Sequence, residues 1–481
     1  MTLRNKTITG LFWNSIDSFL NQGVQFAIGI ILARILSPKE FGLMAILTIV
    51  ISISQSLIDS GFSNALIRKK DCTQEDFSTI FYFNLLISIV LYFLLFVFSG
   101  IISSFFNEPQ LKTLIKVLGL GLILNSFTII QRVKLTKELN FKMQMQISVS
   151  ATLIAGIVAV VLAFNGFGVW SLIALALCRF GLTSIFFWIG SKWRPAVVFS
   201  KKSFIELFSF GSKLLMSGLI DTIFKNVYNL VIGKYFLAVQ LGYYTMADQF
   251  QALPSNNLSG IISRVIYPVL SEIQDDKLKL KTAYQRIIQS TMLVSFLLMF
   301  MIAAIAEPMI IVLIGEKWLP SVLYLQLLCF VGMLVPLHVL NLNMLQVQGR
   351  SDLFLRLEVI KKLLALPVII LGIVYGIKIL IIGMIGLSLI ALYFNSYWSG
   401  KFIGYTFIQQ IKDITPAFFM TLAIGIIVVV IGNFLDTTNL LKLIIQISAG
   451  IILFLGIAES TKMKDYLYIK NIIFDKLKIQ G

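Results

Sequence analysis

Polar and charged side chains recur at helical spacing inside stretches that are otherwise apolar. Within residues 10–32 they are Asn14, Asp17, Asn21 and Gln25. Within residues 212–233 they are Ser217, Asp221, Lys225 and Asn229. Steps of three and four residues place each set on one stripe of a helix. Carboxylates in such a stripe can bind Na⁺ or H⁺, and an ammonium group can bind a phosphate.

Two neighbouring stretches carry further polar stripes. Residues 41–63 contain Thr48, Ser52, Gln55, Ser56, Asp59 and Ser63, and residues 241–263 contain Asp248, Ser255, Asn256, Ser259 and Ser263. A charge at mid-membrane costs about 2.5–3.5 kcal/mol on insertion scales, so it faces protein or water. The four stripes therefore predict a water-filled cavity. The alternative is hydrogen bonding between packed helices.

Individual charged residues allow two interpretations each. Asp221 and Lys225 are four residues apart and can pair with each other, or Lys225 can bind an anionic headgroup. Arg179 is either a cation of the cavity or the partner of a buried carboxylate. Arg34 and Arg264 lie near helix ends, where a cation either reaches toward lipid headgroups or meets a substrate phosphate.

The elements that carry these stripes are membrane-spanning helices. The chain has 481 residues, of which 58% are hydrophobic and 13% charged, and its mean hydropathy is +0.90. Apolar runs of roughly 20 residues recur, each long enough to cross the bilayer. We expect an all-α polytopic protein of about fourteen spans, near 10–32, 41–63, 79–99, 113–130, 146–164, 168–190, 212–233, 241–263, 286–306, 320–342, 357–375, 378–397, 414–433 and 440–458.

The basic residues are distributed unequally between the two sides of the membrane. Of the 40 Lys and Arg residues, 30 fall in alternate segments that include both termini and 8 in the others, when residues near the end of a span are counted with the adjoining segment. Arg179 and Lys225 lie deeper inside spans. This positive-inside bias places both termini in the cytoplasm. The formal charge of +17 then reflects topology and contact with anionic membrane lipids, and we expect no nucleic-acid partner.

The two halves of the chain repeat each other. Arg34 corresponds to Lys234 and Gly42 to Gly242, and Glu108–Pro109 recurs as Glu307–Pro308. Six spans separate the copies, so both have the same orientation in the membrane. We therefore predict two pseudo-symmetric six-helix lobes around a central cavity, plus two C-terminal helices. The predicted parts are an N-lobe (1–190), a connector (191–211), a C-lobe (212–398), spans 13 and 14 (399–458) and a basic cytoplasmic tail (459–481).

Cysteine and histidine suggest no further chemistry. Cys72, Cys178 and Cys329 show neither disulfide nor metal-ligand spacing, and we expect no metal site. His338, beside Pro336, is interpreted as a packed or hydrogen-bonded helix residue rather than a proton relay.

Five segments give the chain a family resemblance. They are LARILSPKEFGLMAI at 32–46, GFSNALIRKKDCTQEDFSTIFYFN at 61–84, IGKYFLAVQLGYYTMADQFQALP at 232–254, IGEKWLPS at 314–321 and QVQGRSDLFLRLE at 346–358. In order and spacing they resemble the Wzx-type polysaccharide flippases of the multidrug/oligosaccharidyl-lipid/polysaccharide superfamily, and in particular the branch that serves lipopolysaccharide (O-antigen), colanic acid and teichuronic acid pathways.

The resemblance implies a substrate and a mechanism. The substrate is a lipid-linked oligosaccharide of the undecaprenyl-pyrophosphate type, which is moved across the bacterial inner membrane by alternating access. The pyrophosphate would meet Lys225 and Arg179, then Arg264 and Arg34. This chain departs from the family pattern, because its mid-membrane acids Asp17, Asp59, Asp221 and Asp248 outnumber those two mid-membrane bases. The net sign of the cavity is therefore left open.

The polar stripes and the family resemblance allow three functions. The first is a flippase with no cofactor, since no ATP-binding GxxxxGK[ST] motif is present. One driving force for it is Na⁺ or H⁺ coupling at Asp17 or Asp221. A glycan polymerase is a candidate partner. The second is a cation or drug antiporter of the same superfamily, which the excess of acids favours. The third, a membrane glycan polymerase or glycosyltransferase, requires a sizeable outer loop that the sequence lacks.

Overall fold

A computed structural model describes the chain except residues 1–2, 60, 469 and 472–481, and it leaves the side chains of residues 3–12, 14 and 15 undescribed. Asn14, and residues 469 and 472–481 of the predicted tail, therefore lie outside the described side chains. The described residues form helices joined by short connections and contain no strand. Two compact units, residues 1–245 and 246–481, divide the chain inside helix α10. The predicted lobe boundaries follow the sequence repeat instead and remain predictions.

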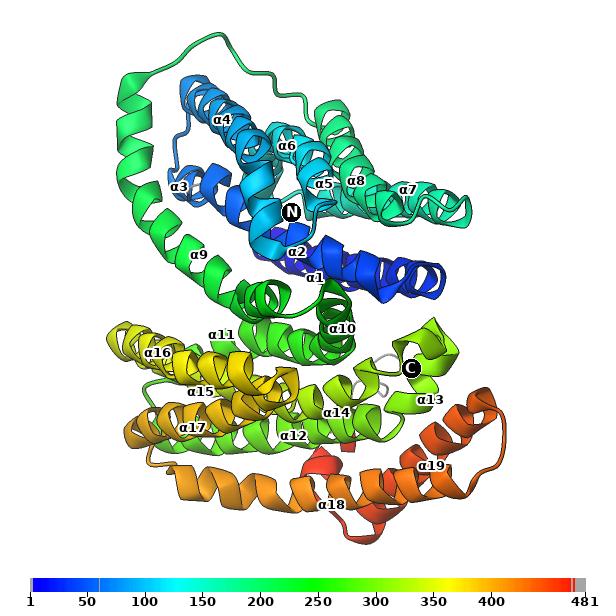
Figure 1. Ribbon diagram of the computed structural model, residues 1–481. Helices are drawn as coiled ribbons and strands as arrows, with labels where there is room; N and C mark the ends of the chain where they lie inside the picture. Colours follow the sequence, from blue (N-terminus) through cyan, green and yellow to red (C-terminus); the bar gives the residue numbers. More distant parts are fainter. Residues whose placement is uncertain (1–2, 60, 469, 472–481) are drawn as a thin grey trace. The chain divides into compact units, whose positions relative to one another are not determined.

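The first unit contains a layered bundle of long helices (Figure 1). Its elements are α1 (Leu3–Ile35), α2 (Pro38–Asp59), α3 (Phe62–Arg68), α4 (Gln74–Phe106), α5 (Leu111–Leu118), α6 (Leu120–Lys137), α7 (Phe141–Phe164), α8 (Val169–Gly190), α9 (Lys201–Tyr235) and the start of α10 (Ala238–Ile261). Helix α7 packs between α1 and α8, and α6 packs against α4 and α8. Helix α9 follows a curved path along α4, α3 and α2 (Figure 1).

The second unit continues with the rest of α10 and, among its described residues, with the α-helices α11 to α19. They are α11 (Tyr267–Glu272), α12 (Lys277–Ala304), α13 (Ala306–Ile314), α14 (Ser321–Gly332), α15 (Val335–Val347), α16 (Ser351–Tyr375), α17 (Ile377–Ile403), α18 (Phe407–Phe434) and α19 (Asn439–Ser460). A π-helical turn (Ile262–Ile266) precedes α11, and a 3₁₀ turn (Glu316–Trp318) precedes α14. The two C-terminal helices pack on this unit, α18 on α12 and α19 on α13.

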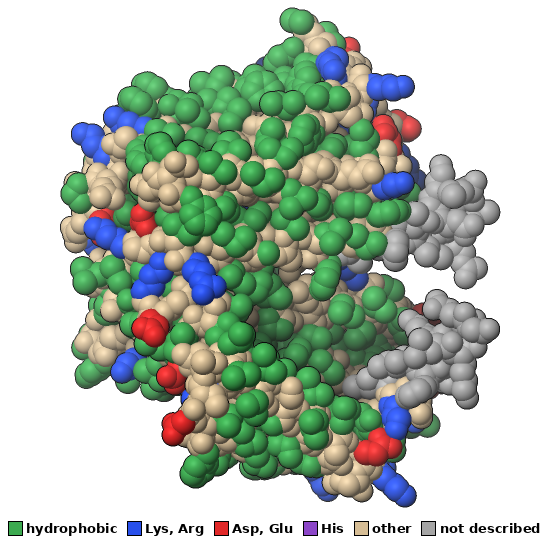
Figure 2. Space-filling model, turned by 90° about the vertical axis from the view of Figure 1, so that its right-hand side faces the viewer, with side chains coloured by type: hydrophobic (Ala, Val, Ile, Leu, Met, Phe, Trp, Pro, Cys, Tyr) green, Lys and Arg blue, Asp and Glu red, His purple; other side chains and the backbone are tan. Residues whose placement is uncertain are grey.

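The surface and the helix lengths are those of a multi-pass membrane protein. Among the described residues, twelve helical segments are long and apolar enough to cross a membrane. Hydrophobic side chains cover broad areas of the face in Figure 2, while charged side chains lie mostly near its edges. Such exposed apolar area is stable only against lipid or protein. The expected spans at 241–263 and 357–375 are helices, α10 and α16, but fall outside the twelve; the fold is consistent with fourteen spans.

The predicted repeat is visible in the helix boundaries. Helix α1 ends at Ile35 and α9 ends at Tyr235, whereas α2 begins at Pro38 and α10 begins at Ala238. Each boundary recurs 200 positions later, with the same two-residue break between the helices. The turn is closed by backbone bonds from Glu40 N to Ser37 O (3.1 Å) in one copy and from Gln240 N to Leu237 O (2.9 Å) in the other.

The two copies of this turn meet at their glycines. A Cβ atom on Gly42 would overlap the carbonyl oxygen of Ala238, and a Cβ atom on Gly242 would overlap the carbonyl oxygen of Pro38. The contact is reciprocal, because Pro38 and Ala238 are themselves equivalent in the repeat. Only glycine allows two helix backbones to approach so closely. The register of the glycines is therefore explained by packing.

We expect Gly42→Ala and Gly242→Ala each to lower stability by about 1–3 kcal/mol, because the added methyl group forces the two helices apart. The double variant should cost less than the sum of the two, since one displacement makes room for both methyl groups. Thermal unfolding of the purified protein measures both effects. The control is Gly100→Ala, where a Cβ has open space and should be tolerated or stabilising. An equal loss in all three single variants would contradict the packing role.

Candidate functional site

A polar cavity of about 590 Å³ lies inside the first unit, between α2, α3, α6 and α9. Its polar and charged lining consists of Ser52, Gln55, Ser56, Asp59, Ser63, Asn125, Thr128, Arg132, Thr136, Asp221, Thr222 and Lys225. Most of the stripe predicted at 41–63, which α2 and α3 carry, and part of the stripe predicted on α9 thus face one space. Hydroxyl and amide groups dominate the lining, and they can hydrogen-bond sugar hydroxyls or water.

The charges in this cavity are balanced. Asp59 and Asp221 face it together with Arg132 and Lys225. The Asp59 carboxylate is held in place by the hydroxyl of Ser63, which donates to Oδ1 at 2.5 Å. Asp17 and Asp59 both attract the Arg132 guanidinium electrostatically. A space with both signs can bind a cation, an anion or a dipolar group, so its composition alone does not select a substrate.

Several polar atoms at the cavity wall have no protein partner. Among the described residues, Gln55 Nε2 and Thr128 Oγ1 are buried and make no hydrogen bond within the protein. An unsatisfied buried polar group costs about 1–3 kcal/mol. Gln55 and Thr128 line the cavity, but these two atoms are shielded from solvent in this structure. A guest in the cavity can therefore satisfy them only after the side chains turn toward it.

Asp17 and Asn21 occupy a different environment. Asp17 Oδ1 accepts hydrogen bonds from Ser148 Oγ (2.6 Å) and from Asn21 Nδ2 (2.5 Å). Thr152 Oγ1 donates to Asn21 Oδ1 at 3.2 Å. Ser148 and Thr152 belong to α7, so this part of the α1 stripe joins two packed helices. For these two residues the hydrogen-bonded interpretation describes the structure.

The other predicted residues of the first unit do not line this cavity. Gln25 and Arg34 are exposed on α1, and Arg34 lies in its last turn. Arg179 is half-buried on α8, with its guanidinium 5.8 Å from the Phe180 ring. Asn229 is half-buried on α9, and its buried Oδ1 has no protein partner.

Two predicted residues belong to the second unit. Asp248 is half-buried in α10, and Arg264 is exposed in the π-helical turn at Ile262–Ile266. His338 lies deeper in this unit, with Nε2 2.9 Å from Ser388 Oγ and Nδ1 3.2 Å from Asn395 Nδ2. The prediction that His338 is a hydrogen-bonded helix residue is confirmed. No group of three metal-ligating side chains gathers among the residues described.

Arg132 is the cavity residue that the sequence analysis missed. The expected span ended at residue 130, which left Arg132 in a basic loop, but α6 continues to Lys137. The signal was present, since Asn125, Thr128, Arg132 and Thr136 follow one another at steps of three and four and all face the cavity. A fifth polar stripe was therefore readable on this helix.

We expect Asp17→Ala to lower stability by about 1–3 kcal/mol, because it removes the acceptor shared by Ser148 and Asn21. Gln25→Ala, on the same helix but exposed, should change stability by less than about 0.5 kcal/mol. Thermal unfolding of the purified variants compares them. Equal stability of Asp17→Ala and the parent protein would show that the bonds between α1 and α7 do not support the fold.

Comparisons with known proteins agree with this architecture. Residues 31–323 match the family described as polysaccharide biosynthesis protein. The chain is 29% identical to the lipopolysaccharide biosynthesis protein WzxC of Escherichia coli, over 77% of this chain and 76% of that protein. It is 28% identical to the succinoglycan biosynthesis transport protein ExoT of Rhizobium meliloti, over 66% of this chain and 64% of that protein.

A solved structure shares the fold. The lipid II flippase MurJ in an inward closed conformation superimposes with a TM-score of 0.77, covering 94% of this chain and 99% of that one at 17% identity. The family match spans more than half of the chain, and the predicted resemblance is thereby confirmed. This chain belongs to the polysaccharide biosynthesis protein family.

Proposed function

We propose that this protein is a flippase that moves a polyprenyl-pyrophosphate-linked oligosaccharide across the bacterial inner membrane during surface polysaccharide synthesis. The observation that carries the proposal is the cavity of α2, α6 and α9, which combines hydroxyl and amide groups with Arg132 and Lys225. A pyrophosphate needs cationic donors, and an oligosaccharide needs many hydrogen-bonding groups. The names of the relatives, which refer to polysaccharide biosynthesis and transport, support the same class.

The proposed cycle is alternating access, in which the headgroup and sugars enter the cavity while the isoprenoid tail stays in lipid. Lys225 and Arg132 take the role of pyrophosphate cations, and Arg179, Arg264 and Arg34 lie on its proposed path. Asp59 and Asp221 hold these cations in place before the substrate arrives, since opposite charges in one space reduce the cost of burial. Both termini are proposed to be cytoplasmic, and a glycan polymerase is the proposed consumer of the product.

The proposed driving force is a gradient of Na⁺ or H⁺ coupled through Asp17 or Asp221. Binding of either ion would neutralise a carboxylate and weaken its hold on a neighbouring cation. Transport into vesicles with an imposed Na⁺ or pH gradient tests this part separately. The same rate with and without both gradients would leave substrate supply as the driving force.

Lys225→Ala and Arg132→Ala should each reduce surface glycan at least tenfold, because each removes a charge-assisted contact worth about 1.5–3 kcal/mol. Glycan is measured on whole cells, and the amount of protein in the membrane is measured alongside it. The matched control is Lys213→Ala, an exposed lysine on the same helix that lies outside the cavity lining. Normal surface glycan in Lys225→Ala cells would refute its role.

Deletion of the protein should leave lipid-linked repeat units on the cytoplasmic leaflet, since the sugars cannot cross hydrocarbon unaided. Leaflet position is measured by access of a glycan-modifying enzyme to sealed spheroplasts. Units that reach the outer leaflet at the normal rate would show that another protein is the flippase. Sensitivity of the deleted strain to cationic dyes, with glycan export unchanged, would favour the antiporter.

A further inference from the structure

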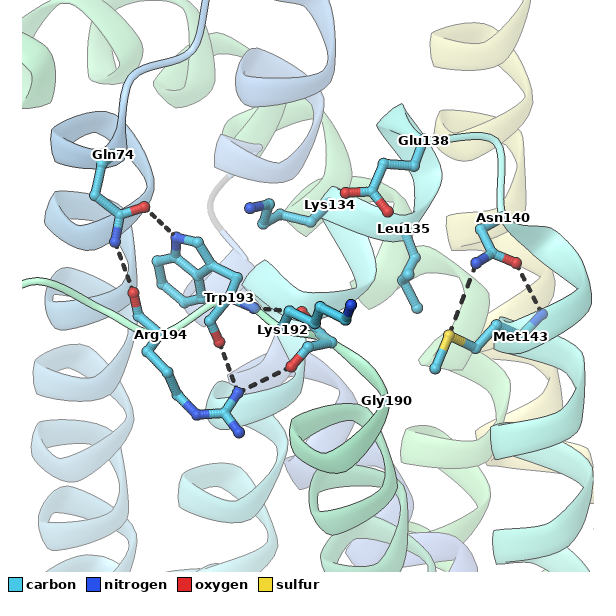
Figure 3. A pocket seen from close by; sticks show the side chains of 11 residues that line it. Gln74, Lys134, Leu135, Glu138, Asn140, Met143, Gly190, Lys192, Trp193 and Arg194 are labelled. Atoms are coloured by element: carbon cyan, nitrogen blue, oxygen red, sulfur yellow. Dashed lines mark hydrogen bonds between the residues drawn. The ribbon is translucent and has the colours of Figure 1, made fainter.

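A second polar pocket lies at the shared end of four helices in the first unit (Figure 3). It has a volume of about 490 Å³ and is built by the start of α4, the connection from α6 to α7 and the segment that follows α8. None of its lining residues belongs to the cavity of α2, α6 and α9. The pocket is therefore a separate site.

Positive charge dominates this pocket. Lys134, Lys192 and Arg194 line it together with one carboxylate, that of Glu138. In the part of the chain that the structure describes, none of these three cations forms a salt bridge. Three cations that share a pocket with one carboxylate leave a net positive charge, and an incoming anion reduces the repulsion between them.

Lys69, in the same unit, is a cation that forms ion pairs. Lys69 Nζ lies 3.1 Å from Asp76 Oδ2 and 3.1 Å from Glu206 Oε2. Burial works against the charge of Lys69, but its hydrogen bonds to Asp76 and Glu206 prevail and raise the pKa of Lys69 above its usual value. Lys69 thus has two carboxylate partners, whereas the described contacts of Lys134 and Lys192 include no ion pair.

The pocket is held in shape by hydrogen bonds that do not consume its charge. Trp193 Nε1 donates to Gln74 Oε1, and Gln74 Nε2 donates to the Arg194 carbonyl oxygen, both at 2.6 Å. Arg194 Nη1 donates to the carbonyl oxygens of Ser191 (2.9 Å) and Trp193 (2.8 Å). Figure 3 shows these bonds: the two of Gln74 fasten the segment after α8 to the start of α4, and the two of Arg194 are local to that segment. Pre-organised cations bind an anion at a lower entropy cost.

Aromatic rings fix the cations further. The Lys134 ammonium lies 5.9 Å from the ring centre of Trp193 and 5.5 Å from that of Phe77, and the Arg194 guanidinium lies 5.2 Å from that of Trp188. Tryptophan beside lysine and arginine is typical of the level of lipid headgroups. The apolar segments Gln74–Phe106 and Val169–Gly190 begin and end at this pocket, which places it where membrane meets water.

We propose that this pocket binds a phosphate group at the membrane surface, held by Lys134, Lys192 and Arg194. The group is either the phosphate of an anionic lipid in the adjoining leaflet or that of a soluble phosphate compound. The site lies outside the cavity and does not depend on what the cavity transports. Its occupation would brace α4, α6, α7 and α8 against one another at this end of the unit.

The test compares the purified full-length protein with Lys134→Gln/Lys192→Gln. Thermal stabilisation is titrated with phosphatidylglycerol in mixed micelles, with phosphatidylcholine and with inorganic phosphate. The matched control is Lys201→Gln/Lys202→Gln, which removes two exposed lysines at the start of α9, outside the pocket. Lys134→Arg/Lys192→Arg keeps the charge and shows whether the substituted protein is folded.

We expect the parent, the arginine variant and the control to bind phosphatidylglycerol or phosphate, and the glutamine variant to bind it roughly tenfold or more weakly. Binding of phosphatidylglycerol alone identifies a lipid headgroup, and binding of inorganic phosphate alone or as well identifies the phosphate itself. Equal responses of the parent and the glutamine variant, equal losses in the control variant, or stabilisation by phosphatidylcholine to the same extent would each overturn the proposal. So would loss of binding in the arginine variant.

Discussion

The cost of leaving a charge unsatisfied in hydrocarbon determines where the polar groups of this protein lie. The chain meets this cost in two ways within its first unit. Asp17 and Asn21 are absorbed into hydrogen bonds with Ser148 and Thr152 of the adjacent helix. Asp59 and Asp221 instead share a polar cavity with Arg132 and Lys225. The first solution produces a rigid helix pair, and the second produces a space that can exchange its contents.

The basic residues of the first unit are divided in a corresponding way. Lys69 is neutralised by two carboxylates and helps to fasten α3, α4 and α9. Arg132 and Lys225 face equal numbers of acids in the cavity. Lys134, Lys192 and Arg194 outnumber the single acid in their pocket. The composition of the chain gives only the total number of basic residues. The acids around each basic residue distinguish structural cations from cations that are available to a ligand.

Much of the fold could be predicted from the sequence because the pattern of residues around the break between two helices recurs 200 positions later. The equivalence of Gly42 and Gly242 predicted a duplicated turn, and both turns are present. The site was harder to predict. A hydropathy window placed Arg132 in a loop because Lys134 and Lys137 follow it closely, although its polar spacing continued a helix. The partners of Asp17 could not be foreseen, since Ser148 and Thr152 are ordinary small residues until packing brings them to α1.

The meeting of Gly42 and Gly242 has a mechanical consequence. The atoms nearest to a Cβ on either glycine are main-chain atoms of the opposite helix, with no side chain among them. Such a contact is closely packed but weak, because a Cα–H···O contact is weaker than an N–H···O hydrogen bond. At the two glycines themselves, no side chain interlocks with the opposite helix. The duplicated turn therefore contributes a close fit between the helix ends rather than a strong attachment.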